Sequence, residues 1–222
     1  KSEKDLSIFD NYRIVGTTND SELLSYGGET ISLDEAYAIN KAPLEKVYPT
    51  REKAPTSKIK VAACKTRADL KPKVTVETPL VVIPVFPGTN CEDDCTRAFR
   101  KEGAEVVQVL IRNLNKEALI ESVDRLEKEI RTAQIIMLPG GFSAGDEPDG
   151  SAKFIATVFR NEKIKDAVMD LLNNRDGLML GICNGFQALI KLGLVPYGEI
   201  RDIEEDMATL TYNNINRHMS SI

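Results

Sequence analysis

The chain has 222 residues, of which 42% are hydrophobic and 28% are charged, and its net charge at pH 7 is −5. These proportions are ordinary for a folded domain, and no apolar run approaches the length of a membrane-spanning helix, about 20 residues. The negative charge argues against a general nucleic-acid surface. Four scattered cysteines do not suggest a disulfide framework, so we expect a cytoplasmic location. From the apolar runs and the net charge we expect no membrane and no nucleic-acid partner.

The first part of the chain is predicted to lack a substantial hydrophobic core. Residues 1–48 combine a strand-like piece at residues 13–15, a turn at Gly27 and Gly28, and a short helix over residues 33–39. A segment of this size is too small for a substantial core, so we expect it to pack on something else. Residues 49–78 are rich in proline, lysine and threonine, which predicts a linker.

Residues 79–193 alternate between strand-like and helix-like patterns. Short apolar runs predict strands over residues 80–85, 106–111, 135–138 and 178–182, and their apolar character predicts burial on both faces. Pro84 predicts that the first strand ends nearby. Alternation with helices makes a doubly wound, mostly parallel sheet the expected fold, of the α/β class. Ligands of such sheets bind at the carboxyl ends of the strands.

Several residues are typical of helix ends. Gly103 and Gly193 are placed to stop the helices that precede them. Asn115 is a suitable N-cap, and Leu114 and Leu119 have the spacing of a hydrophobic staple across that cap.

The segment Gly181-Ile182-Cys183-Asn184-Gly185 is the most informative in the chain. It joins the last predicted strand to a predicted helix, with glycine two residues away from the cysteine on each side. That layout is typical of a nucleophile elbow, in which a strained turn presents the nucleophile at a helix N-terminus. The free N–H groups there stabilise negative charge. The pattern therefore predicts that Cys183 is a nucleophile.

A cysteine that attacks a carboxamide builds negative charge on oxygen, which requires hydrogen-bond donors. The N–H groups of Asn184 and Gly141 are the expected donors, because the loop at Gly140 and Gly141 also follows a predicted strand. The alternative is that Cys183 is a small buried core residue beside an ordinary turn.

Other reactive residues give weaker signals. The loop that holds Asp146, Glu147 and Asp149 suggests a lid, an interface or a metal site, but a solvated loop is the simpler interpretation. Cys91 and Cys95 are four residues apart, without further metal ligands nearby, which favours a structural role. The single histidine, His218, has no carboxylate two residues later, and we favour a non-catalytic role for it.

Three motifs carry a resemblance to a known family. They are Pro87-Gly88-Thr89-Asn90-Cys91-Glu92, Pro139-Gly140-Gly141-Phe142-Ser143-Ala144-Gly145-Asp146 and Gly181-Ile182-Cys183-Asn184-Gly185-Phe186-Gln187. They resemble the class I glutamine amidotransferase domain of the phosphoribosylformylglycinamidine synthases. The extension at residues 147–151 is similar to the large single-chain form of these enzymes. The resemblance covers about residues 80–217, and residues 1–48 more weakly resemble the tail of the synthetase region.

The resemblance implies an ATP-dependent ligase of de novo purine biosynthesis with a flavodoxin-like glutaminase domain over residues 79–222. It implies that Cys183 attacks L-glutamine, that Gly141 and Asn184 form the oxyanion hole, and that ammonia passes to the synthetase region. The glutamine-binding residues that it implies are Phe142, Gln187, Asn213 and Arg217. No cofactor and no metal are expected in this segment, whereas the synthetase region would use ATP and Mg.

One departure from the family is serious. The family's catalytic histidine and its glutamate partner lie downstream of the segment that holds Asn213 and Arg217, and no such pair occurs before Ile222. We therefore expect a C-terminally incomplete domain, with exposed apolar sheet edges and impaired turnover. Two alternatives remain open: another elbow-cysteine hydrolase or redox α/β protein, and a non-catalytic interaction module.

Overall fold

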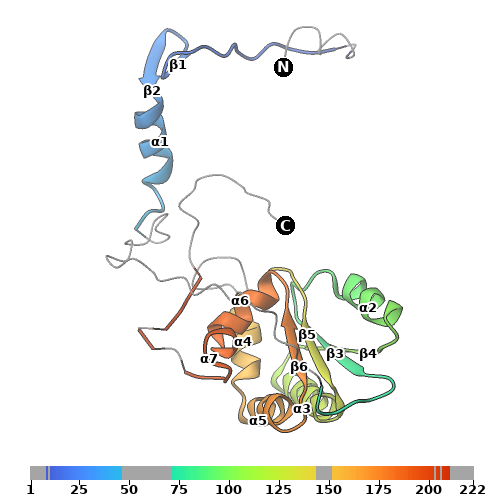
Figure 1. The fold of residues 1–222 in the computed structure, drawn as a ribbon. Helices are drawn as coiled ribbons and strands as arrows, with labels where there is room; N and C mark the ends of the chain where they lie inside the picture. Colours follow the sequence, from blue (N-terminus) through green and yellow to red (C-terminus); the bar gives the residue numbers. More distant parts are fainter. Residues whose placement is uncertain are drawn as a thin grey trace, which may run out of the picture. The chain divides into compact units, whose positions relative to one another are not determined.

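The computed structural model describes residues 9, 11–46, 72–143, 152–202, 204, 205 and 207–210. The chain divides into two compact units, Lys1–Thr50 and Arg51–Ile222. Figure 1 shows the elements of both units.

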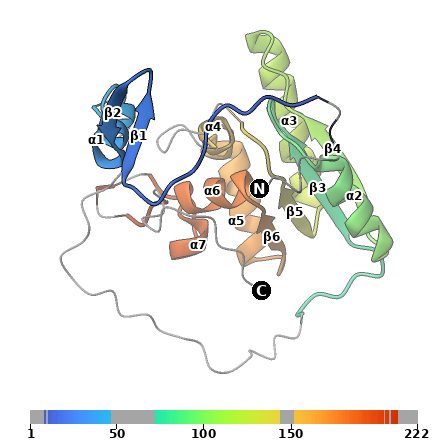
Figure 2. The ribbon, with the colours of Figure 1, turned by 90° about the horizontal axis from the view of Figure 1, so that it is seen from above.

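The N-terminal unit is a hairpin followed by a helix. Strands β1 (Leu23–Tyr26) and β2 (Glu29–Ser32) pair antiparallel, and Gly27 and Gly28 supply the positive φ angles of the turn between them. Helix α1 (Leu33–Lys41) begins at Ser32, whose side chain accepts a hydrogen bond from the Glu35 N–H. The helix therefore starts where the hairpin ends and continues away from it (Figure 1), so the two overlap when seen from above (Figure 2).

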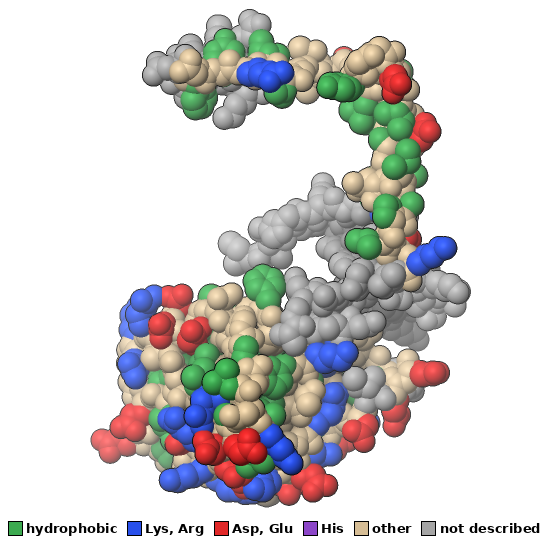
Figure 3. All heavy atoms as spheres, turned by 180° about the vertical axis from the view of Figure 1, so that it is seen from behind, with side chains coloured by type: hydrophobic (Ala, Val, Ile, Leu, Met, Phe, Trp, Pro, Cys, Tyr) green, Lys and Arg blue, Asp and Glu red, His purple; other side chains and the backbone are tan. Residues whose placement is uncertain are grey.

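This unit buries very little apolar surface. None of the residues of α1 is buried, and all of β1 is exposed. Figure 3 shows apolar side chains on its surface, in keeping with the expectation of a segment without its own core. The strand predicted over residues 13–15 is wrong, since Val15 is 94% exposed and pairs with no described strand. The nearby strands β1 and β2 pair with each other instead.

The second unit is built on a parallel sheet with the order β4-β3-β5-β6. Its strands are β3 (Leu80–Val85), β4 (Glu105–Leu110), β5 (Ile135–Leu138) and β6 (Leu178–Gly181). Its helices are α2 (Glu92–Lys101), α3 (Lys116–Thr132), α4 (Lys153–Phe159), α5 (Glu162–Asn173), α6 (Asn184–Lys191) and α7 (Leu194–Tyr197). The predicted α/β fold with a parallel sheet is confirmed.

The two faces of this sheet are covered unequally. One face packs its main core against α3, α4, α5 and α6, with Leu126, Ile155 and Val168 among the buried side chains. The opposite face packs a smaller cluster around Val81 and Ile83 against α2 (Figure 1). The chain passes from β3 to β4 on one side of β3 and then crosses to β5 on its other side, so the strand order switches between β3 and β5. Open α/β sheets bind ligands at the carboxyl ends of the strands at such a switch point.

Burial on both faces is correct for β3 and β5 but wrong for β6 and for part of the edge strand β4, where Leu110 is 57% exposed. Leu178 and Leu180 are 64% and 45% exposed, because β6 is an edge strand and α2 covers only the other half of their face. Pro84 is tolerated near the end of β3 because the pairing of β3 with β5 ends at Val82.

The helix ends mostly follow the sequence signals. The Asn115 side chain caps α3 by accepting from the Ala118 N–H at 2.8 Å, and Gly103 and Gly193 have positive φ after α2 and α6. The predicted staple is wrong, since Leu114 is 87% exposed. The Arg175 guanidinium adds a cap that the sequence does not suggest, donating to the carbonyl oxygens of Ile130 and Ala133 at 2.8 Å each.

Candidate active site

Cys183 lies in a tight turn between β6 and α6. Strand β6 ends at Gly181, helix α6 begins at Asn184, and Cys183 between them has φ 52° and ψ −107°. A non-glycine residue with positive φ is strained by about 1 to 3 kcal/mol, and such strain gathers at functional sites. The thiol is exposed. The predicted strand–turn–helix arrangement is confirmed.

The flanking glycines are required by close approach. A Cβ at Gly185 would overlap the carbonyl oxygen of Leu138, the last residue of β5. A Cβ at Gly181 would stand 2.6 Å from the carbonyl group of Gly185. The elbow therefore folds back onto the end of β5, and this packing explains why the sequence has glycine two residues away on each side of Cys183.

The loop after β5 brings Gly141 to the same edge of the sheet. The Phe142 N–H donates to the Gly88 carbonyl and the Asn90 N–H donates to the Gly140 carbonyl, both at 2.8 Å, so the loop is tied to the end of β3. Gly141 has φ 134°, and a Cβ there would stand 2.7 Å from the Asn90 nitrogen. A Cβ at Gly140 would lie 3.5 Å from the Cys183 Cβ, which places this loop beside Cys183.

Two backbone donors at this edge have no acceptor among the residues that the structure describes. No described residue accepts a hydrogen bond from the N–H of Gly141 or from the N–H of Asn184. By contrast, the Phe142 N–H is committed to Gly88, and the Gly185 N–H donates to the Ile182 carbonyl at 2.9 Å. The two donors predicted from the sequence are therefore among the backbone N–H groups at this edge for which no described residue is an acceptor.

A buried side-chain network joins the loop to the helix. The Asn184 Oδ1 accepts from the Ser143 hydroxyl at 2.7 Å and from the Ser143 N–H at 3.2 Å. The Asn184 Nδ2 donates to the Gln187 Oε1 at 2.8 Å. Ser143 and Asn184 are 0% and 1% exposed. A role for Ser143 could not be predicted from the sequence, because nothing local to its motif indicates a partner 41 residues away.

The structure places some predicted site residues here and leaves others undescribed. Phe142 is 58% exposed beside Gly141, and Gln187 is half-buried on the first turn of α6. Asn213, Arg217 and His218 lie outside the described residues, as do Asp146, Glu147 and Asp149. The described part of the candidate site therefore consists of Cys183, the two candidate donors, Phe142 and Gln187.

Cys91 and Cys95 form a pair of thiols at the start of α2. Burial raises the pKa of the Cys95 thiol, and the nearby Cys91 and Asp94 add to this effect. Cys95 packs against the cluster around Val81, which fits the structural role favoured from the sequence. Among the described residues, no group of three or more histidine, cysteine, aspartate or glutamate side chains is arranged to hold a metal ion.

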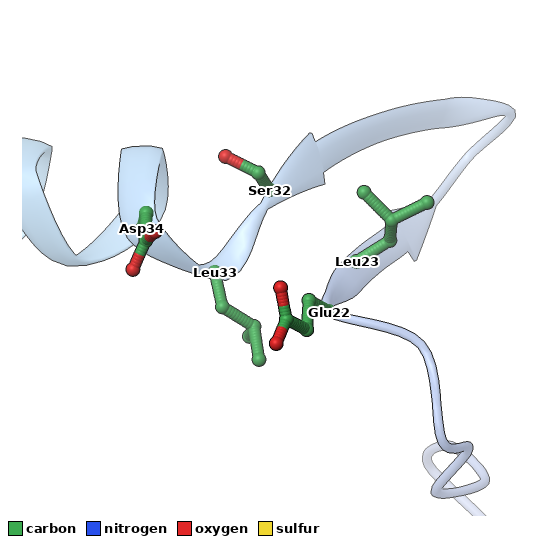
Figure 4. A pocket seen from close by; sticks show the side chains of 5 residues that line it. All are labelled: Glu22, Leu23, Ser32, Leu33 and Asp34. Atoms are coloured by element: carbon green, nitrogen blue, oxygen red, sulfur yellow. The ribbon is translucent and has the colours of Figure 1, made fainter.

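The N-terminal unit has a pocket of about 280 Å³, shown in Figure 4. Two acidic residues line it, Glu22 and Asp34, together with Leu23, Ser32 and Leu33. No residue predicted to be catalytic or to bind glutamine lies there. In the described part of the chain, no helix is both long and apolar enough to cross a bilayer.

Comparisons with known proteins place this site in a family. The chain is 38% identical over 136 residues to the phosphoribosylformylglycinamidine synthase subunit PurQ of Dehalococcoides mccartyi, covering 59% of this chain and 46% of that protein. It is 36% identical over 140 residues to the same subunit of Methanococcus maripaludis, covering 63% and 47%. The chain thus spans about half the length of these curated relatives.

A solved structure, that of PurLQS from Thermotoga maritima, is similar at 32% identity over 53% of this chain and 45% of that one, with a TM-score of 0.36. Residues 78–222 match the family of CobB/CobQ-like glutamine amidotransferase domains. The chain belongs to the CobB/CobQ-like glutamine amidotransferase domain family.

Proposed function

We propose that the chain hydrolyses the side-chain amide of L-glutamine through Cys183. One observation carries this proposal: an exposed cysteine at a strained elbow lies beside two N–H groups, of Gly141 and Asn184, that no described residue uses. Two donors and a nucleophile at one sheet edge are what an attack on a carboxamide requires.

In the first step, a lone pair of the Cys183 thiolate forms a bond to the amide carbon, and the carbonyl π electrons move onto oxygen. The N–H groups of Gly141 and Asn184 donate to that oxygen. Because they are fixed by the loop and by the helix start, they need no reorganisation as the charge develops. Phe142 and Gln187 border the space that glutamine would occupy.

In the second step, an electron pair on the oxyanion re-forms the C=O bond and the C–N bond breaks. The nitrogen keeps that bond's electron pair and takes a proton, and ammonia leaves behind a thioester. Water then adds to the thioester carbon, and the C–S bond breaks with its electrons returning to sulfur, which releases glutamate. The proton transfers need a general acid–base group. We assign that role to a histidine paired with a glutamate beyond Ile222 in the complete enzyme, and we assign Asn213 and Arg217 to glutamine binding.

The complete enzyme that we propose is a phosphoribosylformylglycinamidine synthase of purine biosynthesis. Support comes from relatives that are subunits of that enzyme. In this proposal residues 1–48 are the tail of the synthetase region, 49–78 a linker and 79–222 the glutaminase domain of a cytoplasmic, large single-chain form. The synthetase region would receive the ammonia and use ATP and Mg to convert formylglycinamide ribonucleotide to its amidine.

We further propose that the 222 residues are a piece of that enzyme. Leu178 and Leu180 of the edge strand β6 are exposed, and an apolar groove of about 320 Å³ lies beside β6 and is lined by Leu189 and Leu194. An exposed apolar sheet edge is a liability that complete proteins cover. The piece alone is expected to acylate slowly, since loss of a triad member leaves only the oxyanion hole and substrate binding.

The direct test labels the protein with a glutamine-mimicking diazoketone and locates the adduct by mass spectrometry. We expect an adduct at Cys183 that glutamine blocks, and no adduct in Cys183→Ser. Cys64, Cys91 and Cys95 are internal controls in the same chain. Equal labelling of all four thiols, unaffected by glutamine, would contradict the proposal and favour a redox or interaction role.

A further inference from the structure

The network around Asn184 connects the two candidate oxyanion donors. Ser143 follows Gly141 by two residues in the loop after β5, and Asn184 itself supplies the second donor. The bonds from Ser143 to the Asn184 Oδ1, at 2.7 and 3.2 Å, therefore bridge the two segments that must stay at a fixed separation.

The orientation of the Asn184 amide is determined by its partners. Its oxygen faces an N–H group, which can only donate, and its nitrogen faces the Gln187 Oε1, which can only accept. A reversed amide would place a donor against the Ser143 N–H and an acceptor against an acceptor. Because Ser143 and Asn184 are buried, water cannot replace these bonds.

The other side of the loop is already fixed. The Phe142 N–H donates to Gly88 and the Asn90 N–H donates to Gly140, which ties the loop to the turn that follows β3 but not to the elbow. Of the hydrogen bonds among described residues, those of Ser143 to the Asn184 side chain are the ones that join this loop to α6 through side chains.

We infer that Ser143 and the Asn184 side chain form a latch that holds the Gly141 and Asn184 N–H groups at their working separation and orients Gln187 for glutamine. Both are positioning residues in this role, since the hydroxyl and the amide act through the backbone donors and through Gln187. The inference rests on the proposed glutaminase function.

The two halves of the latch have different kinetic consequences. Ser143→Ala leaves Asn184 with one donor and loosens the loop, so it is expected to lower kcat about 10- to 100-fold in the complete enzyme with little change in KM. Asn184→Ala also releases Gln187, so it is expected to lower kcat and to raise KM. The double variant is expected to be no slower than the slower single variant, because the two side chains act as one unit.

A matched control is available in the same domain. Ser122 is also a buried serine, 3% exposed, whose hydroxyl donates to the Ala118 carbonyl at 2.7 Å and accepts from the Arg112 N–H at 3.1 Å. Ser122→Ala is expected to reduce stability by a similar amount and leave kcat unchanged. Ser143→Thr, which keeps the hydroxyl, is expected to recover most of the activity lost in Ser143→Ala.

A second readout separates positioning from thiol reactivity. A glutamine-mimicking chloroketone passes through a tetrahedral anion at Cys183, whereas iodoacetamide alkylates the thiolate by direct displacement. Ser143→Ala is expected to slow the first reaction at least 10-fold and to leave the second unchanged. Equal slowing of both, or of neither, in a folded variant would overturn the latch. If wild-type Cys183 fails to react with the chloroketone, the proposed glutaminase function is contradicted. The latch, which rests on that function, is then contradicted as well.

Discussion

Gly185 of the elbow helix lies so close to Leu138 that a Cβ at Gly185 would overlap the Leu138 carbonyl oxygen. This contact joins the end of β5, from which the loop with Gly141 continues, to the turn that holds Cys183. The obstacle is backbone, which cannot move aside as the end of a flexible side chain does. The relative positions of the loop and the nucleophile therefore depend on the absence of a side chain at this residue.

Gly185→Ala is expected to lower the free energy of unfolding by about 3 kcal/mol, at the upper end for an overpacked site, and to abolish glutamine-protected labelling of Cys183. Gly140→Ala is the matched control for stability alone, since its Cβ would meet the Cys183 Cβ at 3.5 Å, an ordinary van der Waals distance. Urea unfolding and mass spectrometry measure the two effects. An alanine at residue 185 with wild-type stability would contradict the packing account.

Arg175 is expected to stabilise the C-terminus of α3. Its guanidinium donates to the Ile130 and Ala133 carbonyl oxygens and pairs with Asp170, so Arg175→Ala should lower the free energy of unfolding by about 1 to 3 kcal/mol. Arg175→Lys should recover little, because an ammonium does not reproduce the planar fork. Arg97→Ala, which removes an exposed ion pair with Asp94, should change the unfolding free energy by less than about 1 kcal/mol.

The contacts of Asp170 with Asn174 and Arg175 make the free energy of unfolding depend on pH. Hydrogen bonds from Asn174 and then Arg175 hold the pKa of the Asp170 carboxyl below its usual value. A carboxyl with a lowered pKa stabilises the fold fully above its unfolded pKa, about 3.9, and the contribution is lost as the pH falls through the folded value. Asp170→Asn should therefore flatten the loss of stability below about pH 4. Asp166→Asn, at an exposed residue of the same helix, should leave that loss unchanged.

Sequence patterns were sufficient for the features that depend on local geometry. The elbow follows from two glycines around Cys183, and the parallel sheet follows from apolar runs that alternate with helices. The exposure of Leu180 could not be predicted, because it depends on which strand lies at the edge. The bond between Ser143 and Asn184 could not be predicted either, since it joins residues 41 apart that meet only when β5 and β6 pair.

Leu180 tests whether the apolar face of β6 is covered in the complete enzyme. In the 222-residue chain, Leu180→Glu should reduce the binding of a hydrophobic dye and reduce aggregation, because the side chain is 45% exposed on an edge strand. In the complete enzyme the same variant should lower stability or solubility, since a buried charge would replace an apolar contact.

Ile120→Glu is the control, because Ile120 is 49% exposed on α3 and not on the sheet edge. This variant should be tolerated equally in the 222-residue chain and in the complete enzyme. Dye fluorescence, light scattering and thermal unfolding of both lengths measure the difference. If Leu180→Glu is as harmless as Ile120→Glu in the complete enzyme, this face of β6 is exposed there too. The exposed face of β6 would then no longer support the proposal that the sheet of the 222-residue chain is incomplete.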